Sequence, residues 1–308
     1  MKLPDRYYTP CTEPGTVEHI RYTSRAYALE RFYGEECPPL EKSMYVYLPY
    51  GYDNSKKYNV LYLLHGGTDD EGYWFGEGRF PASDTRIYTD AGNITRNLAD
   101  HMIQEGSAKP LIIVTPSFNE DVPRFQKRPD YADAYFSNSS YFWMEMENDI
   151  MPCIQKRYSV YAEGTTRQDF AAAREHQAYA GASQGSVTGY FSVMEHMADL
   201  FAYIGSYSAG MIRFELQPAF HVTADKERME AAARALRAAP PLRYWYNGCG
   251  DRDQMFDTHL ATYQYMLDAC PEHLTEKNCC FAAGPGGEHN YRQWITDLYR
   301  CLKIFFKK

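Results

Sequence analysis

Short apolar runs alternate along the chain with longer stretches in which apolar residues recur every three or four positions. The short runs predict β-strands, and the longer pattern predicts amphipathic helices. The predicted strands cover residues 17–24, 43–48, 60–64, 111–115, 178–182, 202–206, 242–247 and 278–283. The predicted helices cover residues 93–105, 143–158, 184–197, 224–238, 254–269 and 291–306. Strands that alternate with helices in this way indicate an α/β fold.

Two of the predicted strands are apolar along almost their whole length. Residues 61–64 read Leu-Tyr-Leu-Leu, and residues 111–114 read Leu-Ile-Ile-Val. Continuous apolar strands are typical of a parallel sheet that helices cover on both faces. Residues 43–48 alternate more, as expected of an edge or antiparallel strand. The sequence therefore predicts a mostly parallel eight-stranded sheet flanked by helices.

Two segments fit neither pattern. Residues 68–91 and 117–142 lack a regular period, and the second is rich in aromatic residues. Loops of this length in a compact domain are usually functional or mobile. The aromatic-rich insertion at 117–142 follows the fourth predicted strand, on the side where active sites of open α/β sheets form. It either forms a lid or pocket wall, or packs its aromatic side chains onto the core.

Composition narrows the class of protein. The 308 residues are 44% hydrophobic and 23% charged, which is typical of a globular chain. We expect one catalytic domain over residues 1–308, in which residues 1–40 form an N-terminal extension and the first strand. The formal net charge of -8, without a block of Lys or Arg, disfavours nucleic acid and anionic membranes as partners. No apolar run reaches membrane-spanning length, and the N-terminus lacks the apolar core of a signal peptide. The compartment stays undetermined, since an excised module of a secreted enzyme would look the same.

The eight cysteines show no zinc-binding spacing and no Cys-x-x-Cys pair. Several lie in apolar runs, where a thiol behaves as a small core residue. We therefore expect mostly free thiols and no metal, although Cys270 and Cys279 could close one loop.

The segment Gly181-Ala182-Ser183-Gln184-Gly185 joins a predicted strand to a predicted helix. A serine hydroxyl is a weak nucleophile unless a base removes its proton. The α/β-hydrolase fold places such a serine on a sharp strand-to-helix turn, with small residues two positions before and after it. We therefore predict that Ser183 is the nucleophile of a serine hydrolase with this fold.

The segment His65-Gly66-Gly67-Thr68 directly follows the third predicted strand. Attack on an ester creates an oxyanion, which preorganised N–H groups must stabilise. In this fold one N–H belongs to the residue after the nucleophile, here Gln184, and another to the loop after the third strand. We expect Gly67 to supply the second, with Thr68 as the alternative, and His65 to tie the loop by a hydrogen bond.

The remaining members of the triad should follow in the order acid, then histidine. His289 follows the last predicted strand and a Gly-rich loop and precedes the last helix, which is the position of the base. Asp251 and Asp253 both lie in the loop after the seventh predicted strand. We favour Asp253 as the acid, while Asp251 would hold the turn.

At this point the chain resembles the feruloyl and acetyl-xylan esterases of carbohydrate esterase family 1, the esterase D-like group. The resemblance extends over residues 40–308 and rests on residues 47–52, 58–67, 147–152, the Ser183 segment, residues 250–253 and residues 289–294. The family's elbow commonly reads G-x-S-M-G-G, from which Gln184 and Ser186 depart, and Tyr291 replaces the first Trp of the family's H-x-W-x-x-W. The resemblance implies an esterase that cleaves ferulate or acetate from xylan without a cofactor.

We therefore predict a serine carboxylesterase that hydrolyses feruloyl groups on plant xylan, either on its own or as a module of a larger plant-polymer-degrading enzyme. The alternatives are an acetyl-xylan esterase or another small-acyl (thio)esterase or acyltransferase, and, less favoured, a non-catalytic carbohydrate-binding module. Aromatic faces can stack on sugars or on a feruloyl ring. Trp74, Trp143 and Trp294 are the candidate substrate contacts, and each could instead pack in the core.

Overall fold

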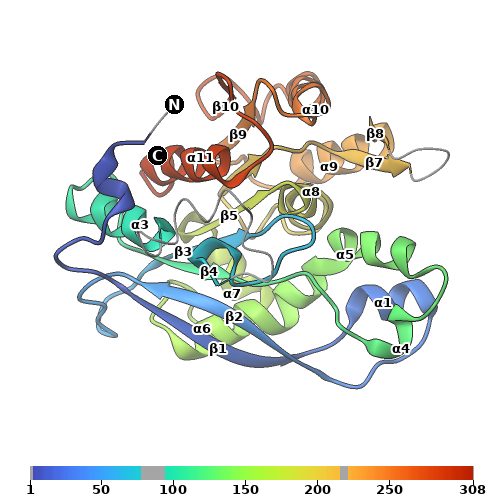
Figure 1. The fold of residues 1–308 in the computed structure, drawn as a ribbon, viewed down its shortest axis with the longest axis horizontal. Helices are drawn as coiled ribbons and strands as arrows, with labels where there is room; N and C mark the ends of the chain where they lie inside the picture. The colour runs from blue at the N-terminus through green and yellow to red at the C-terminus, as the bar shows by residue number, and fades with distance from the viewer. Residues whose placement is uncertain (1–2, 78–93, 216–220, 308) are drawn as a thin grey trace.

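An eight-stranded sheet crosses the centre of the computed structural model, which describes residues 3–77, 94–215 and 221–307 (Figure 1). The strand order is β1-β2-β4-β3-β5-β6-β9-β10. The strands are β1 (Thr16–Ser24), β2 (Leu40–Leu48), β3 (Asn59–Leu64), β4 (Leu111–Thr115), β5 (Gln177–Ala182), β6 (Tyr203–Tyr207), β9 (Tyr244–Gly250) and β10 (Cys279–Gly284). Each overlaps one predicted strand, so the sequence-based account of the sheet is confirmed.

Six of the eight strands, from β4 to β10 in the order of the sheet, run parallel to one another. Strand β2 is antiparallel to both β1 and β4, as its alternating pattern predicts, although β1 and not β2 lies at the edge. Strand β3 lies inside the sheet between β4 and β5. Its apolar run is buried on both faces, because Leu61 and Leu63 enter one core while Val60, Tyr62 and Leu64 enter the other.

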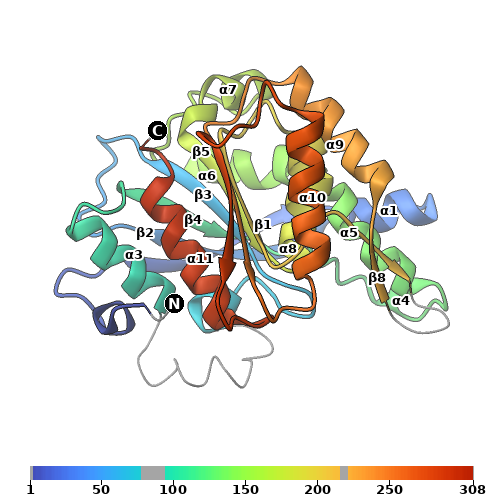
Figure 2. The ribbon, with the colours of Figure 1, turned by 90° about the horizontal axis from the view of Figure 1, so that it is seen from above.

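Helices cover both faces of the sheet (Figure 2). Helices α3 (Ile94–Gln104) and α11 (Tyr291–Ile304) pack into the core that contains Leu61. The opposite core receives side chains from α6 (Met151–Arg157), α8 (Gln184–Thr188), α9 (Lys226–Ala238) and α10 (Phe256–Ala269). The remaining short helices are α1 (Tyr27–Tyr33), α7 (Arg167–Ala172) and the 3-10 turns Asp5–Tyr8, Tyr73–Phe75 and Arg174–His176.

The prediction of an irregular insertion at 117–142 is wrong for most of its length. The segment forms α4 (Pro123–Gln126) and most of α5 (Tyr131–Glu145), which continues through a π-helical turn (Met146–Ile150) into α6. The buried side of α5 includes three polar residues, Asn138, Ser139 and Glu145, so no apolar stripe marks it in the sequence. Polar contacts take the place of apolar ones: the Ser139 hydroxyl accepts a hydrogen bond from Thr188 on α8.

Other differences concern short elements and the ends of helices. Neither α1 nor the two-stranded hairpin of β7 (Ile212–Glu215) and β8 (His221–Ala224) was predicted from the sequence. The helix after Ser183 is α-helical only to Thr188 and then forms a π-helix over Gly189–Met194. Of the predicted loop at 68–91, residues 78–91 lie outside the described residues, as does Asn93 at the predicted start of α3.

Two further features bear on the sequence-based expectations. All eight cysteines are free thiols, and Cys270 and Cys279 are not joined. Across the three described stretches, no helix has both the length and the apolar character needed to cross a bilayer.

Candidate active site

The three predicted triad residues meet at the carboxyl ends of β5, β9 and β10. The hydroxyl of Ser183 lies 2.9 Å from Nε2 of His289. On the other side of the ring, Nδ1 of His289 lies 2.9 Å and 3.0 Å from the two carboxylate oxygens of Asp253. This arrangement lets Ser183 donate to the imidazole while the imidazole donates to the carboxylate, which is the hydrogen-bond chain of a Ser-His-Asp triad.

The turn that carries Ser183 is sharp and strained. Ser183 has φ 53° and ψ -116°, a conformation that L-residues rarely adopt, and helix α8 begins at the next residue. A Cβ added to Gly181 would lie 2.4 Å from the backbone of Gly185, and a Cβ on Gly185 would lie 2.5 Å from the carbonyl oxygen of His65. Only glycine fits at these two positions, which explains the small residues on either side of the serine.

The loop that carries His289 is held against the loop that carries the acid. The carboxylate of Asp251 accepts a 2.7 Å hydrogen bond from the N–H of Gly286, which has φ +68°. The N–H of Arg252 donates to the carbonyl oxygen of Gly287. Asp251 is therefore committed to the turn before His289, and the structure brings Asp253, not Asp251, to the imidazole.

Asp253 is held in its charged form. Its side chain is fully buried, and burial raises the pKa of the carboxyl. The hydrogen bond and the charge of His289, together with the N–H of Met255 at 2.8 Å, outweigh burial and leave the pKa of Asp253 below its ordinary value. The carboxylate can thus fix the imidazole orientation and stabilise an imidazolium at neutral pH.

Two polar residues near Asp253 carry no signal in the sequence. Ser208, at the end of β6, is fully buried with φ 56°, and its hydroxyl contributes to the lowered pKa of Asp253. His259 lies in α10 with Nε2 3.1 Å from Oδ1 of Asn247. Burial lowers the pKa of His259 to about 3, so this imidazole is neutral and supports the site rather than taking part in proton transfer.

The candidate oxyanion residues lie side by side. A Cβ added to Gly67 would lie 2.9 Å from Oε1 of Gln184, and one added to Gly66 would lie 3.4 Å from Cβ of Ser183. Gln184 is the first residue of α8, where N–H groups have no partner within the helix. Thr68, the alternative to Gly67, is one residue further along and exposed, with φ 69°.

His65 ties the glycine loop, as the sequence predicts. Its side chain is buried; Nδ1 donates to the carbonyl oxygen of Gly66 at 2.6 Å, and Nε2 accepts from the hydroxyl of Ser117 at 2.9 Å. The imidazole thus joins the loop after β3 to the loop after β4. These two contacts hold the loop in place and give His65 a structural role.

Of the three candidate tryptophans, the structure brings one to the triad. Trp294 packs edge-to-face on His289 with ring centroids 5.2 Å apart. Trp74 is 1% exposed and packs among core aromatic rings, including Tyr291. Trp143 stacks on His196, and its backbone N–H donates to the hydroxyl of Ser192. A substrate contact by Trp74 or Trp143 therefore stays a prediction.

The site holds no cluster suited to a metal ion: within residues 3–77, 94–215 and 221–307, no three His, Cys, Asp or Glu side chains lie close enough to coordinate one. The chemistry that the arrangement supports is acyl transfer by a serine, a base and an acid.

Comparison with known proteins identifies the family. The model of the esterase family, described as "Putative esterase", matches residues 38–304. This chain belongs to the esterase family. It is 34% identical over 310 residues to endo-1,4-beta-xylanase Y of Acetivibrio thermocellus, an alignment that covers 98% of the chain and 24% of the xylanase. The chain thus spans less than two thirds of that relative's length.

Solved structures confirm the fold. The feruloyl esterase module from Clostridium thermocellum, complexed with sinapinate, is 26% identical and superposes with a TM-score of 0.72, over 100% of this chain and 93% of that one. A ferulic acid esterase from Anaeromyces mucronatus, in complex with ferulic acid, is 22% identical with a TM-score of 0.68, over 99% and 96% of the two chains. The chain has the α/β-hydrolase fold, as its sequence predicts.

Proposed function

We propose that this protein is a serine carboxylesterase that releases feruloyl groups from plant xylan, with Ser183 as nucleophile, His289 as base and Asp253 as acid. The observation that carries the assignment is the unbroken hydrogen-bond chain from the Ser183 hydroxyl through His289 to Asp253, built on a strained strand-to-helix turn. We also infer that residues 1–308 form a single catalytic domain, since the sheet and both cores draw on segments from the whole chain.

The reaction proceeds in two acyl transfers. The oxygen of Ser183 bonds to the ester carbonyl carbon while its proton passes to Nε2 of His289, and the carbonyl π electrons move onto the oxygen. The N–H groups of Gln184 and Gly67 donate to this oxyanion. When the intermediate collapses, the bond to the sugar oxygen breaks and that oxygen takes the proton from His289. Water then attacks the acyl-serine with the same proton transfers, releasing the acid and restoring Ser183.

The relatives support the substrate. One solved relative is a feruloyl esterase module that holds sinapinate, and the curated relative is a xylanase of which this chain matches 24%. A hydroxycinnamoyl ester on xylan is a substrate consistent with the names of both relatives. By the same reasoning the chain is proposed to act as one module of a larger xylan-degrading enzyme. Trp294, packed on His289, is the proposed aromatic contact next to the reacting carbonyl.

The assignment is tested with two esters and one variant. We expect the purified protein to hydrolyse methyl ferulate, with a kcat/KM at least about tenfold above that for 4-nitrophenyl acetate. Turnover of the acetate alone would instead favour a small-acyl esterase. Ser183→Ala should abolish hydrolysis of both esters while the protein stays folded, and residual activity within about tenfold of wild type would show that Ser183 is not the nucleophile.

A further inference from the structure

A polar cavity of about 240 Å³ lies on the same edge of the sheet as the triad. It is formed by the start of β2, the loop after β3 and the loop after β4. Because β2 is antiparallel, its first residues meet the carboxyl ends of the parallel strands. The side chains that matter to its chemistry are those of Glu41, Ser43, Asp70, Glu71, Asn119 and Asp121.

The cavity adjoins the loop that carries the proposed oxyanion donor. Asp70 and Glu71 follow Gly67 by three and four residues, and the bond from His65 to Ser117 joins the two loops at the rim of the cavity. Strands β4 and β5 lie on either side of β3. With neighbouring strands about 4.8 Å apart, the end of β4 lies about 10 Å from the end of β5, where Ser183 stands. A ligand in the cavity is thus within the reach of a short oligosaccharide from the reacting ester.

The lining suits a hydroxylated ligand rather than an aromatic one. No aromatic side chain is among the described residues that line the cavity, whereas carboxylates, hydroxyls and an amide are. Such groups accept and donate the hydrogen bonds that sugar hydroxyls need. The face of a hydroxycinnamoyl ring would keep water from these polar groups without offering hydrogen bonds in return, at a cost in free energy.

The charge of the lining points to an uncharged ligand. Four carboxylates line the cavity, from Glu41, Asp70, Glu71 and Asp121, against one ammonium group, that of Lys42. The Lys42 ammonium is 2.8 Å from the carboxylate of Glu145, which is buried, and this pairing largely cancels its charge. The excess of negative charge should repel a uronic acid and tolerate a neutral pentose.

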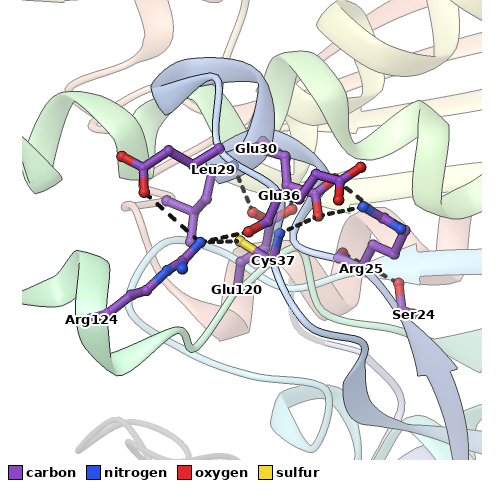
Figure 3. Close-up of polar contacts among 10 residues, drawn as sticks. Ser24, Arg25, Leu29, Glu30, Glu36, Cys37, Glu120 and Arg124 are labelled. Atoms are coloured by element: carbon purple, nitrogen blue, oxygen red, sulfur yellow. Dashed lines mark hydrogen bonds and ion pairs between the residues drawn. The ribbon is translucent and has the colours of Figure 1, made fainter.

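The loop after β4 is anchored to helix α1. Glu120 lies between Asn119 and Asp121, yet its carboxylate is buried and accepts the N–H groups of Ala28 and Leu29 at the start of α1, each at 2.9 Å (Figure 3). This anchor fixes the loop so that its neighbours on either side line the cavity.

Three further hydrogen bonds hold the loops that line the cavity. Nδ2 of Asn119 donates to the carbonyl oxygen of Asp69 at 2.6 Å, and the hydroxyl of Tyr135 donates to Oδ1 of Asn119 at 3.2 Å. The hydroxyl of Thr115 donates to the carbonyl oxygen of Glu71 at 2.7 Å. Because these hydrogen bonds fix the lining groups in place, binding would cost little conformational entropy.

We infer that this cavity is a subsite for the neutral pentose units of the xylan chain that bears the scissile ester. The inference rests on the proposed function, since it takes the alcohol side of that substrate to be a polysaccharide. Glu41 and Asp121, both exposed, are specificity-determining residues that accept hydrogen bonds from the sugar and do not touch the reacting atoms.

The test compares a sugar-linked ester with a sugar-free one. In the double variant Glu41→Ala/Asp121→Ala, we expect kcat/KM for a feruloylated arabinoxylo-oligosaccharide to fall by about tenfold, while kcat/KM for methyl ferulate stays within about twofold of wild type. Glu227→Ala is the matched control, since this carboxylate is 90% exposed on α9. An equal change for both esters, or no change for either, would overturn the subsite.

A binding measurement separates failure of the subsite from failure of the proposed function. Calorimetric titration of Ser183→Ala with an unesterified neutral arabinoxylo-oligosaccharide should show binding that the added Glu41→Ala/Asp121→Ala changes weaken by about tenfold. A glucuronic acid-substituted oligosaccharide should bind at least about tenfold more weakly than the neutral one. If methyl ferulate is not hydrolysed but the sugar still binds in this way, the esterase assignment fails and the subsite stands. Absence of sugar binding, or preference for the uronic acid, would refute the subsite.

Discussion

The backbone N–H of Ser183 donates a 2.8 Å hydrogen bond to the carbonyl oxygen of Tyr207 at the end of β6. Ser183 has φ 53°, so its backbone is strained, and this bond from the next strand helps to hold the residue in place. The proposed nucleophile is therefore positioned by its neighbour in the sheet as well as by its own turn.

Removing the strain at this turn should stabilise the protein. Ala at position 183 keeps the unfavourable φ, whereas Gly adopts it readily, so we expect Ser183→Gly to unfold with a free energy about 1 kcal/mol higher than Ser183→Ala. Urea denaturation of the two inactive variants measures this difference. An Ala variant as stable as the Gly variant would mean that the turn relaxes when the serine is replaced.

Replacing either of the two acidic residues of the loop after β9 should have very different effects on kcat. Asp253→Asn should lower kcat by about 10³- to 10⁴-fold, because an amide cannot hold the imidazole of His289 in the required tautomer. Asp251→Asn should keep kcat within about tenfold of wild type, since its carboxylate holds only the turn at Gly286. Steady-state kinetics on methyl ferulate decides, with circular dichroism as the control for folding. The reverse order of effects would assign the acid to Asp251.

Replacing Trp294 should mainly lower catalytic activity, whereas replacing Trp143 should mainly lower stability. Trp294→Ala removes the ring that packs on His289 and should lower kcat/KM by about tenfold or more. Trp143→Ala should lower the free energy of unfolding by about 2 kcal/mol and leave kcat/KM within about threefold, because this ring stacks on His196 and not on a triad residue. Both variants are compared by urea denaturation and by initial rates. A large loss of activity in Trp143→Ala alone would contradict the arrangement described above.

A buried carboxyl outside the triad should make stability depend on pH. Burial raises the pKa of Asp297 to about 7, against the hydrogen bonds from Tyr246 and Gln293. The folded protein therefore binds more protons than the unfolded chain between about pH 4 and 7, so its free energy of unfolding should fall as pH rises through this window. In Asp297→Asn, the fall from pH 5 to 7.5 should be smaller by about 1–2 kcal/mol. Equal slopes in wild type and variant would show that Asp297 does not titrate in this range.

The central sheet was predictable because its inner strands β3 and β4 are continuous apolar runs, while β2 stands out by its alternation. Helix α5 was not, since its buried side carries Asn138, Ser139 and Glu145 and its packing depends on hydrogen bonds to α8. Hairpin β7–β8 and helix α1 are too short for their periodicity to stand out.

The candidate triad followed from chain order, but its details did not. Asp251 and Asp253 lie in the same loop, and the difference between them depends on the N–H of Gly286, which a sequence cannot place in space. Trp74, which is buried among core rings, and Trp143, which stacks on His196, show the same limit. Proximity to a motif along the chain does not say whether a ring faces the site or the core.

The close approach of Gly181 and Gly185 restricts how this turn can evolve. A side chain at Gly181 would meet the backbone of Gly185, and one at Gly185 would meet the backbone oxygens of Leu64 and His65, so no change in another side chain could make room. Neither glycine can therefore be replaced, whether one at a time or both together. Around Ser183, variation is left to positions such as Gln184, whose side chain lies beside Gly67, and Ser186.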